Sequence, residues 1–376
     1  MLAKASARIA ARCTSSKLAS ISTVIDRLPH RLPTPSVLTR SLIIAPQWIG
    51  DAVMTEPLLR RLHGRGERLT VGALPWVAPV YRAMPQVAEV IEFPFAHGGI
   101  QLRARRQLAQ QLDQQFDRAY VCPNSLKSAL LPFLAGIPVR IGYLGEARVG
   151  LLTHRLKNPA KGKRPPMVAF YSALSAEPDV SLDQPHLQLD ATSVDADLLA
   201  LGLTRLGYHV FAPGAEYGDA KRWPAEHYAQ CAMQLDLPVV LLGSGKEATL
   251  CDSITEPVNA KRAGHCINLA GKTTLAQALS AISATKSMVS NDSGLMHVAA
   301  GFGVRQVAVF GSSSPLHTPP LNTAASVIWL KNQPDYDPPL DCAPCFERSC
   351  PLGHTRCLND ITADMVLRYL QPATHI

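Results

Sequence analysis

The sequence predicts an α/β protein built as two Rossmann-like lobes with a cleft between them, and three observations indicate this. Short apolar segments alternate with segments of helical spacing along most of the chain, which is typical of parallel sheets covered by helices. The alternation stops over residues 157–206, which are rich in Pro, Lys and Asp, and then starts again. Residues 1–40 lack the pattern. We therefore expect an N-terminal extension over 1–40, a first lobe over 41–200 and a second lobe over 201–376.

The first lobe begins with Ser41-Leu-Ile-Ile-Ala45, an apolar run typical of a strand buried in a parallel sheet. Apolar side chains then recur at helical spacing over residues 52–62. The strands expected in this lobe are 41–45, 69–73, 89–93, 118–122 and 139–142, and the expected helices are 52–62, 77–84, 101–112, 128–135 and, in the irregular stretch, 167–174.

The second lobe repeats the alternation. Its expected strands are 208–212, 238–242, 266–269, 288–289, 306–310 and 326–330, and its expected helices are 226–235, 248–254, 275–284, 294–302 and 363–370. Because doubly wound sheets bind ligands beyond the carboxyl ends of their strands, we expect the loops there to line the cleft.

The composition is that of an ordinary globular protein, with 47% hydrophobic and 18% charged residues. No stretch approaches the ~20 consecutive apolar residues that a membrane-spanning helix needs. The formal charge of +8 favours anionic partners, but seven basic residues lie within residues 1–40, where they face only Asp26. The remainder is nearly balanced, so the charge is weak evidence for any partner.

Residues 1–40 have the Arg, Ser and Ala content of an organelle transit peptide and lack the apolar region of a secretory signal. The alternative is an upstream extension of a bacterial reading frame, either disordered or not translated. We prefer this second interpretation and exclude the segment from the fold.

Four loops follow predicted strands and contain Gly together with charged residues. They are Gly50-Asp51, residues 213–224, residues 243–247 and residues 291–300. Cations in such loops can meet phosphates, and a carboxylate can meet ribose hydroxyls. The loops therefore suit a nucleotide diphosphate.

The fourth loop, Asn291-Asp-Ser-Gly-Leu-Met-His-Val-Ala-Ala300, joins a strand to a helix. Free backbone N–H groups and the positive end of a helix dipole would meet there and could bind a phosphate. The alternative is an ordinary helix start, capped by Asp292 or Ser293, with nothing bound.

Other charged residues also admit two interpretations. Asp51 could cap a helix or act as a general base. Lys221 and Arg222 could be a solvated pair or could contact phosphate. His297 could pack in the core or donate to an anion.

Competing nucleotide motifs fail on spacing. Residues 47–50 do not supply the G-x-G-x-x-G of a dinucleotide site after the first strand. Gly245-Lys246 and Gly271-Lys272 lack the preceding glycine of a P-loop, because Val240 and Cys266 stand in its place. A dehydrogenase and a P-loop ATPase are therefore disfavoured.

The cysteines fall into two groups. Five are isolated and expected to be reduced, namely Cys13, Cys122, Cys231, Cys251 and Cys266. The other four are clustered around His354, namely Cys342, Cys345, Cys350 and Cys357. Their first pair is a C-x-x-C zinc half-site, but the second pair has no standard spacing. Zinc binding, partial disulfide pairing and free thiols all stay open, and no metal is assigned to catalysis.

Together these blocks resemble glycosyltransferase family 9, the bacterial ADP-heptose:lipopolysaccharide heptosyltransferases, and within it the enzymes that add the second inner-core heptose. The similarity runs from about residue 41 to the end of the chain. It is carried by residues 44–54, 213–224, 291–300 and 311–320, with the segment 342–354 also typical of that subfamily. Gln47 stands where many relatives have Ser, and the residue after Asp51, Ala52, also differs.

The resemblance implies the glycosyltransferase B fold, with the C-terminal helix packing back on the first lobe. It implies an inverting, cofactor- and metal-independent transfer of L-glycero-D-manno-heptose from ADP-heptose to the first heptose of heptosyl-Kdo2-lipid A. Such an enzyme would be cytoplasmic, would touch the inner membrane transiently because its acceptor is a lipid, and would not bind nucleic acid.

The resemblance also implies roles for individual residues. Asp51 would deprotonate the acceptor hydroxyl, and Lys221 would neutralise the leaving diphosphate. Substrate binding would fall to Arg222, to Glu247 at the ribose or adenine, to Asp292 at the donor sugar, to the N–H groups of Ser293 and Gly294 at the diphosphate, and to His297 as support for that loop.

Two other functions are weighed against this one. A related transferase could use another core acceptor, as the enzyme that adds the first heptose does. A non-enzymatic, zinc-bearing protein could bind nucleic acid through its basic N-terminus, but it would give the strand-end loops no purpose.

Overall fold

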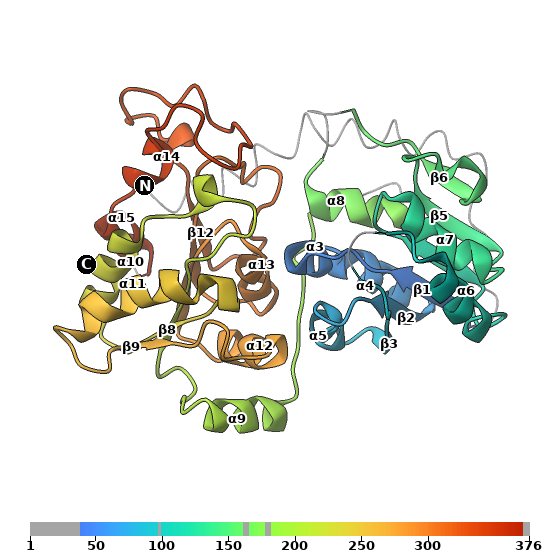
Figure 1. The fold of residues 1–376 in the computed structure, drawn as a ribbon, viewed down its shortest axis with the longest axis horizontal. Helices are drawn as coiled ribbons and strands as arrows, with labels where there is room; N and C mark the ends of the chain where they lie inside the picture. Colours follow the sequence, from blue (N-terminus) through green and yellow to red (C-terminus); the bar gives the residue numbers. More distant parts are fainter. Residues whose placement is uncertain (1–37, 97–98, 161–164, 177–181, 371–376) are drawn as a thin grey trace. The chain divides into compact units, whose positions relative to one another are not determined.

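The computed structural model describes residues 38–96, 99–160, 165–176 and 182–370 (Figure 1). It divides the chain into two compact units, Met1–Leu187 and Gln188–Ile376. Each unit contains one six-stranded parallel sheet with helices, so the predicted α/β class with two Rossmann-like lobes is confirmed. The expected extension falls almost wholly on residues 1–37, outside the described residues.

The sheet of the first unit has the order β3-β2-β1-β4-β5-β6, with all neighbours parallel. The strands are β1 (Arg40–Ile44), β2 (Arg68–Ala73), β3 (Val87–Glu92), β4 (Arg118–Val121), β5 (Val139–Tyr143) and β6 (His154–Leu156). The order reverses between β1 and β4, so ligands of this unit are expected beyond the carboxyl ends of these two strands.

The helices of the first unit are α3 (Ile49–Met54), α4 (Glu56–Gly64), α5 (Ala78–Arg82), α6 (Leu102–Gln111), α7 (Leu126–Leu134) and α8 (Met167–Ser172). The single helix expected over 52–62 is wrong in one respect. The structure has two helices there, because the helix is interrupted at Thr55. Pro57 has no N–H and its ring would clash with the preceding turn, so a new helix starts beside it. The short edge strand β6 was not expected, because His154-Arg-Leu156 has no apolar run.

The second sheet repeats the topology in the order β12-β11-β10-β7-β8-β9, again with all neighbours parallel. Its strands are β7 (His209–Ala212), β8 (Val239–Leu241), β9 (Cys266–Asn268), β10 (Ser287–Asn291), β11 (Gln306–Val309) and β12 (Ala325–Ile328). Its helices are α9 (Ala191–Ala200), α10 (Ala225–Gln234), α11 (Ala248–Asn259), α12 (Leu275–Ser283), α13 (Gly294–Gly301), α14 (Arg356–Asn359) and α15 (Ala363–Leu370).

The division of the chain lies between Leu187 and Gln188, and the boundary expected after residue 200 is wrong. The cause is α9, which the sequence pattern did not predict. Asp190 caps it by accepting a hydrogen bond from the backbone N–H of Ser193 at 2.8 Å, and the helix packs on α12 of the second unit. Only Val194 and Leu198 are buried in α9 while Leu199 is 83% exposed, so no apolar stripe was visible.

The final helix α15 packs on α10 and β11 of the second unit. Its buried residues Val366, Leu367 and Leu370 belong to the core of that unit. The resemblance implied that this helix packs on the first lobe. In the structure its apolar face is used within its own unit, and packing of this helix on the first lobe stays a prediction.

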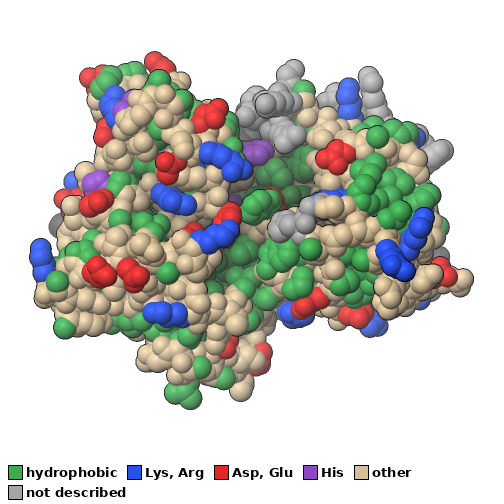
Figure 2. Space-filling view, in the orientation of Figure 1, with side chains coloured by type: hydrophobic (Ala, Val, Ile, Leu, Met, Phe, Trp, Pro, Cys, Tyr) green, Lys and Arg blue, Asp and Glu red, His purple; other side chains and the backbone are tan. Residues whose placement is uncertain are grey.

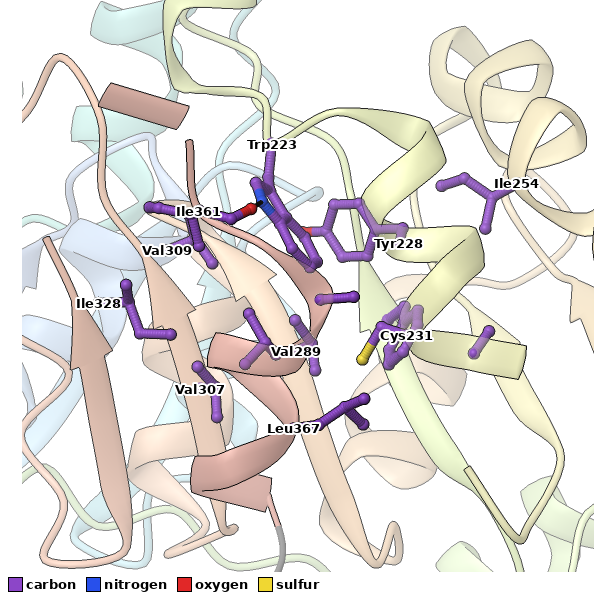
Figure 3. Packing of buried hydrophobic residues seen from close by; sticks show 14 of the residues in the cluster. Trp223, Tyr228, Cys231, Ile254, Val289, Val307, Val309, Ile328, Ile361 and Leu367 are labelled. Carbon is purple, nitrogen blue, oxygen red and sulfur yellow. Dashed lines mark hydrogen bonds between the residues drawn. The ribbon is translucent and has the colours of Figure 1, made fainter. Parts of the chain in front are cut away.

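The core of the second unit surrounds Trp223, which is fully buried (Figure 3). Its indole Nε1 donates to the carbonyl oxygen of Ile361 at 2.7 Å, and its ring meets Tyr228 edge-on at 4.7 Å between centroids. Trp223 ends the loop that follows β7. Its burial therefore anchors one end of a loop expected to bind ligand.

On the face of the second unit seen in Figure 2, acidic and basic side chains are interspersed and form no continuous basic surface. Among the described residues, no helix is long and apolar enough to cross a membrane.

Candidate active site

Asp51 lies in the first turn of α3, directly after the loop that follows β1. The residue at the N-cap position is Trp48, so the alternative in which Asp51 caps the helix is wrong. Its carboxylate still benefits from the helix dipole, because it is the third residue of α3. The side chain is half-buried, which leaves it accessible to a ligand.

Burial raises the pKa of Asp51 to about 6, and a hydrogen bond with the Tyr171 side chain opposes this rise. Asp51 in turn raises the pKa values of Tyr81 and Cys122, so these groups also lie close to it, although burial is the larger cause for both. A carboxylate with this pKa is mostly ionised at pH 7 and is a stronger base than an exposed one. These are the properties of a general base.

A cavity of about 50 Å³ opens in the first unit at the carboxyl ends of β1, β2 and β4. Its lining includes Gln47 of the loop that leads to Asp51, together with Ser125 and Lys127. The cavity thus collects polar and cationic side chains at the strand ends where ligands of this unit are expected, and Asp51 itself does not line it.

In the second unit, Lys221 and Asp292 come together from two different loops. Lys221 follows β7 and Asp292 follows β10, and these two strands are neighbours in the sheet. The Lys221 Nζ atom lies 2.5 Å from Asp292 Oδ2, and the other carboxylate oxygen, Oδ1, accepts a 3.4 Å hydrogen bond from Thr318. The loops after β7, β10 and β11 therefore converge on one carboxylate.

The start of α13 has no side-chain cap. Ser293 occupies the N-cap position, but it makes no capping hydrogen bond and its buried Oγ has no partner. Asp292 is engaged by Lys221 and Thr318. The capping alternative for Asp292 and Ser293 is therefore wrong, and the first turn of α13, which starts at Gly294, remains suited to an anion.

Asn291 is a site residue that the sequence reasoning missed. It is fully buried at the end of β10, and its Oδ1 accepts from the Trp223 backbone N–H at 3.0 Å and from the Tyr228 hydroxyl at 3.1 Å. Its Nδ2 donates to the carbonyl oxygens of Pro213 at 2.6 Å and Gly214 at 3.5 Å. Asn291 thus ties the Lys221 loop to the Asp292 loop. The sequence does contain a signal for this residue, since Asn291 follows an apolar strand pattern and directly precedes Asp292.

Glu247 lies in the loop after β8, and its carboxylate contacts the loop after β7. Its Oε2 accepts from the Ser244 backbone N–H at 2.7 Å in a capping box. A Cβ atom at Gly214 would lie 1.7 Å from Oε1 of Glu247, so a larger residue at this position would displace the Glu247 carboxylate. One carboxylate oxygen of Glu247 is thus already used within the loop, and its place at the ribose or adenine stays a prediction.

Arg222 and His297 differ in their surroundings. The Arg222 guanidinium donates to the Ala215 carbonyl oxygen at 3.4 Å, within its own loop. His297 is buried in α13, and burial lowers its pKa to about 4; Asp292 acts against this shift and Lys221 adds to it. His297 is therefore neutral at physiological pH, so it does not supply a cation there.

The four clustered cysteines line one cavity of about 20 Å³ together with Ala220 and Ser312. Their thiols are free, and among the described residues no three His, Cys, Asp or Glu side chains are placed to hold a metal ion. The segment that carries them braces the Lys221 loop. The Ala220 backbone N–H donates to the Arg348 carbonyl oxygen at 3.0 Å. The Tyr217 hydroxyl donates to the Phe346 carbonyl oxygen at 2.8 Å.

The sequence matches known proteins over most of its length. The model of "Glycosyltransferase family 9 (heptosyltransferase)" matches residues 105–355. The chain is 43% identical over 308 residues to the Lipopolysaccharide heptosyltransferase 2 of Escherichia coli K12, covering 77% of this chain and 87% of that protein. It is 38% identical over 306 residues to the Lipooligosaccharide heptosyltransferase 2 of Haemophilus influenzae, covering 77% and 88% respectively.

Solved structures agree with the sequence matches. The Escherichia coli ADP-heptose lps heptosyltransferase II superposes with a TM-score of 0.75 at 38% identity, covering 88% of this chain and 97% of that one. The Escherichia coli heptosyltransferase WaaC with ADP superposes with a TM-score of 0.64 over 88% and 98% of the two chains; at 17% identity this shows the fold alone.

Proposed function

The chain belongs to glycosyltransferase family 9, the heptosyltransferases, and we propose how its residues carry out the transfer. It transfers heptose to the lipopolysaccharide inner core as a heptosyltransferase II, on the glycosyltransferase B fold. Its donor substrate is ADP-heptose, as membership of the family implies.

The second unit holds the donor. Breaking the bond between sugar and phosphate builds negative charge on the diphosphate, and preorganised positive groups stabilise that charge. Lys221 and the uncapped start of α13, with the N–H groups of Ser293 and Gly294, supply such groups. Asp292 accepts from a donor-sugar hydroxyl and keeps Lys221 in place until the diphosphate arrives.

The remaining donor contacts surround this centre. Glu247 meets the ribose or adenine side, because its loop lies against the backbone of the Lys221 loop. Arg222 contributes positive charge, and its guanidinium donates a hydrogen bond to the Ala215 carbonyl oxygen. His297 is buried in α13 and supports its first turn.

The first unit supplies the base. Asp51 removes the proton from the acceptor hydroxyl as that oxygen attacks the anomeric carbon, and the diphosphate leaves from the opposite side. The configuration at this carbon is therefore inverted. The pKa of about 6 supports this role for two reasons. The carboxylate is ionised at pH 7, and it is more basic than an exposed carboxylate.

The acceptor is heptosyl-Kdo2-lipid A, so the product carries a second heptose. This substrate is a lipid, and we propose transient contact of the enzyme with the cytoplasmic face of the inner membrane. The contact we propose is peripheral, made while the lipid acceptor is bound.

The observation that carries this proposal is the convergence of Lys221, Asp292 and the uncapped α13 turn at neighbouring strand ends. An acceptor series tests the specificity. ADP-heptose is supplied with Kdo2-lipid A bearing no, one or two heptoses, and product is measured by mass spectrometry. We expect turnover only with the acceptor that bears one heptose. Turnover confined to the heptose-free acceptor would instead identify an enzyme that adds the first heptose.

A further inference from the structure

An arginine from the cysteine-bearing segment, residues 342–357, shares one aromatic ring with Lys221. The guanidinium carbon of Arg348 lies 5.1 Å from the centre of the Tyr217 ring, and Lys221 Nζ lies 5.4 Å from the same centre. Tyr217 belongs to the loop after β7 and is 43% exposed. Arg348 was not singled out from the sequence, but the structure makes it a neighbour of the candidate donor site.

The backbone around Arg348 is fixed against the loop that carries Lys221. Besides the two hydrogen bonds already described, Ser349 Oγ donates to Asp219 Oδ1 at 2.8 Å. The two chains also approach closely at Gly218, where a Cβ atom would lie 2.2 Å from the Arg348 carbonyl oxygen. A side chain at Gly218 would therefore push the cysteine-bearing segment away. The Arg348 side chain thus starts from a defined position beside this loop.

The charge of Arg348 is available to a ligand. The Tyr217 hydroxyl donates to the Phe346 carbonyl oxygen at 2.8 Å, so the ring over which Arg348 lies is itself held in place. Arg348 is exposed, and within the described parts of the chain no carboxylate pairs with its guanidinium. A cation held over a fixed ring without an acidic partner can take up an anion at little cost in conformational freedom.

The charges already assigned to the donor site do not balance a diphosphate. Lys221 is paired with Asp292 at 2.5 Å, so the charges of these two groups cancel. The start of α13 contributes only about half a positive charge. Arg222 donates to the Ala215 carbonyl oxygen within its own loop. A nucleotide diphosphate is a dianion and gains charge as it leaves the sugar, so a further cation would stabilise it.

We propose that the Arg348 guanidinium binds the diphosphate of the donor together with Lys221, with the Tyr217 ring as its support. This inference rests on the proposed donor site in the second unit. A guanidinium can donate two parallel hydrogen bonds to phosphate oxygens, and its flat face can at the same time stack on an aromatic ring. The cysteine-bearing segment then contributes a binding residue to the donor site as well as a brace for the Lys221 loop.

The test compares Arg348→Ala with the matched control Arg356→Ala. Arg356 belongs to the same segment and also lies over a tyrosine, 5.3 Å from the centre of the Tyr336 ring, but it pairs with Asp360. Calorimetry measures the affinity of each variant for ADP and for AMP, which lacks the second phosphate. Arg348→Ala should bind ADP about tenfold more weakly and AMP nearly as well as wild type, because the lost contact is with the diphosphate. Arg356→Ala should bind both nucleotides as wild type does.

A second variant, Arg348→Lys, keeps the charge but loses the planar fork. It should recover part of the lost affinity for ADP. Equal losses of ADP and AMP affinity in Arg348→Ala would mean that Arg348 only holds the loop, and an unchanged affinity for ADP would also overturn the proposal.

Lys221→Ala shows whether such a failure reaches the proposed function. If Lys221→Ala weakens ADP binding and Arg348→Ala does not, the donor site stands and only the role of Arg348 is wrong. If neither variant weakens ADP binding, the assignment of the donor site fails together with this inference.

Discussion

The Nζ atom of Lys221 lies 2.5 Å from Oδ2 of Asp292, with the side chains 19% and 7% exposed. Such a pair is sheltered enough for its charges to act strongly on one another, unlike the exposed pairs common on protein surfaces. Lys221 follows β7 and Asp292 follows β10, so the pair connects two strand-end loops of the second unit. It places a cation beside a carboxylate at the site where we propose that the donor binds.

Replacement of this cation should affect both binding and chemistry. Lys221→Ala should weaken ADP binding and lower kcat about 100-fold, because the diphosphate is charged in the ground state and gains charge in the transition state. Calorimetry with ADP and steady-state kinetics measure the two effects. Lys286→Ala is the matched control, since Lys286 is 49% exposed, pairs with Asp236 at 3.2 Å and directly precedes β10, at the amino ends of the strands. Equal losses in both variants would refute a specific role for Lys221.

Asn291 should support donor binding through loop geometry. Asn291→Ala leaves the Pro213 carbonyl oxygen and the Trp223 N–H without their buried partner, which should cost about 2–3 kcal/mol in the free energy of unfolding. It should also weaken ADP binding, because the Lys221 loop is released from β10. Denaturant unfolding and calorimetry give the two values.

Asn268→Ala provides the control for Asn291. Asn268 ends β9 and also uses its amide in hydrogen bonds, at 3.2 Å to the Ala248 carbonyl oxygen and 2.6 Å to Asp252. This variant should lose stability while keeping its affinity for ADP. An Asn291→Ala enzyme that is destabilised yet binds ADP normally would show that the loop connection does not matter for the donor.

His297 should make the second unit less stable in mild acid. Its folded pKa of about 4 lies below the usual 6.5, so its contribution is present above pH 6.5 and is lost as the pH falls toward 4. At pH 5 the loss from this residue should be about 2 kcal/mol relative to pH 7.5. Urea unfolding of wild type and His297→Gln at both pH values measures it. An unchanged pH dependence in the variant would contradict a buried, neutral His297.

The rate of transfer should depend on the ionisation of Asp51. With a pKa of about 6, the carboxylate becomes protonated as the pH falls below that value, and kcat/KM should then fall about tenfold per pH unit. The profile should be flat between pH 7 and 8 if no other group titrates there. An acidic limb near pH 4 would mean that Asp51 is not the group observed.

The strand-end loops could be predicted from the sequence because their chemistry is local. Asp51, Lys221 and Asp292 each follow an apolar strand pattern, and the structure places each in the segment that connects a strand to the next helix or in the first turn of that helix. Tyr171 could not be found in this way. It is separated from Asp51 by five strands along the sequence, it lies in the stretch where the alternation breaks down, and a buried tyrosine resembles any core residue.

The errors in the predicted fold also have local causes. Helix α9 buries only Val194 and Leu198, so its pattern is too weak to separate it from a linker, and the domain boundary was misplaced as a result. For α15 the sequence pattern specifies less than the structure shows. The apolar stripe of Val366, Leu367 and Leu370 predicts a buried face without saying which surface covers it.

The most direct test of the account is the transfer rate of Asp51→Asn under single-turnover conditions, with ADP-heptose and heptosyl-Kdo2-lipid A. This substitution keeps the shape of the side chain and removes its basicity. We expect the rate to fall about 10³-fold or more while the calorimetric affinity for ADP stays at the wild-type value, because Asp51 belongs to the unit that does not hold the donor. Transfer at the wild-type rate in this variant would contradict the assignment of Asp51 as the base.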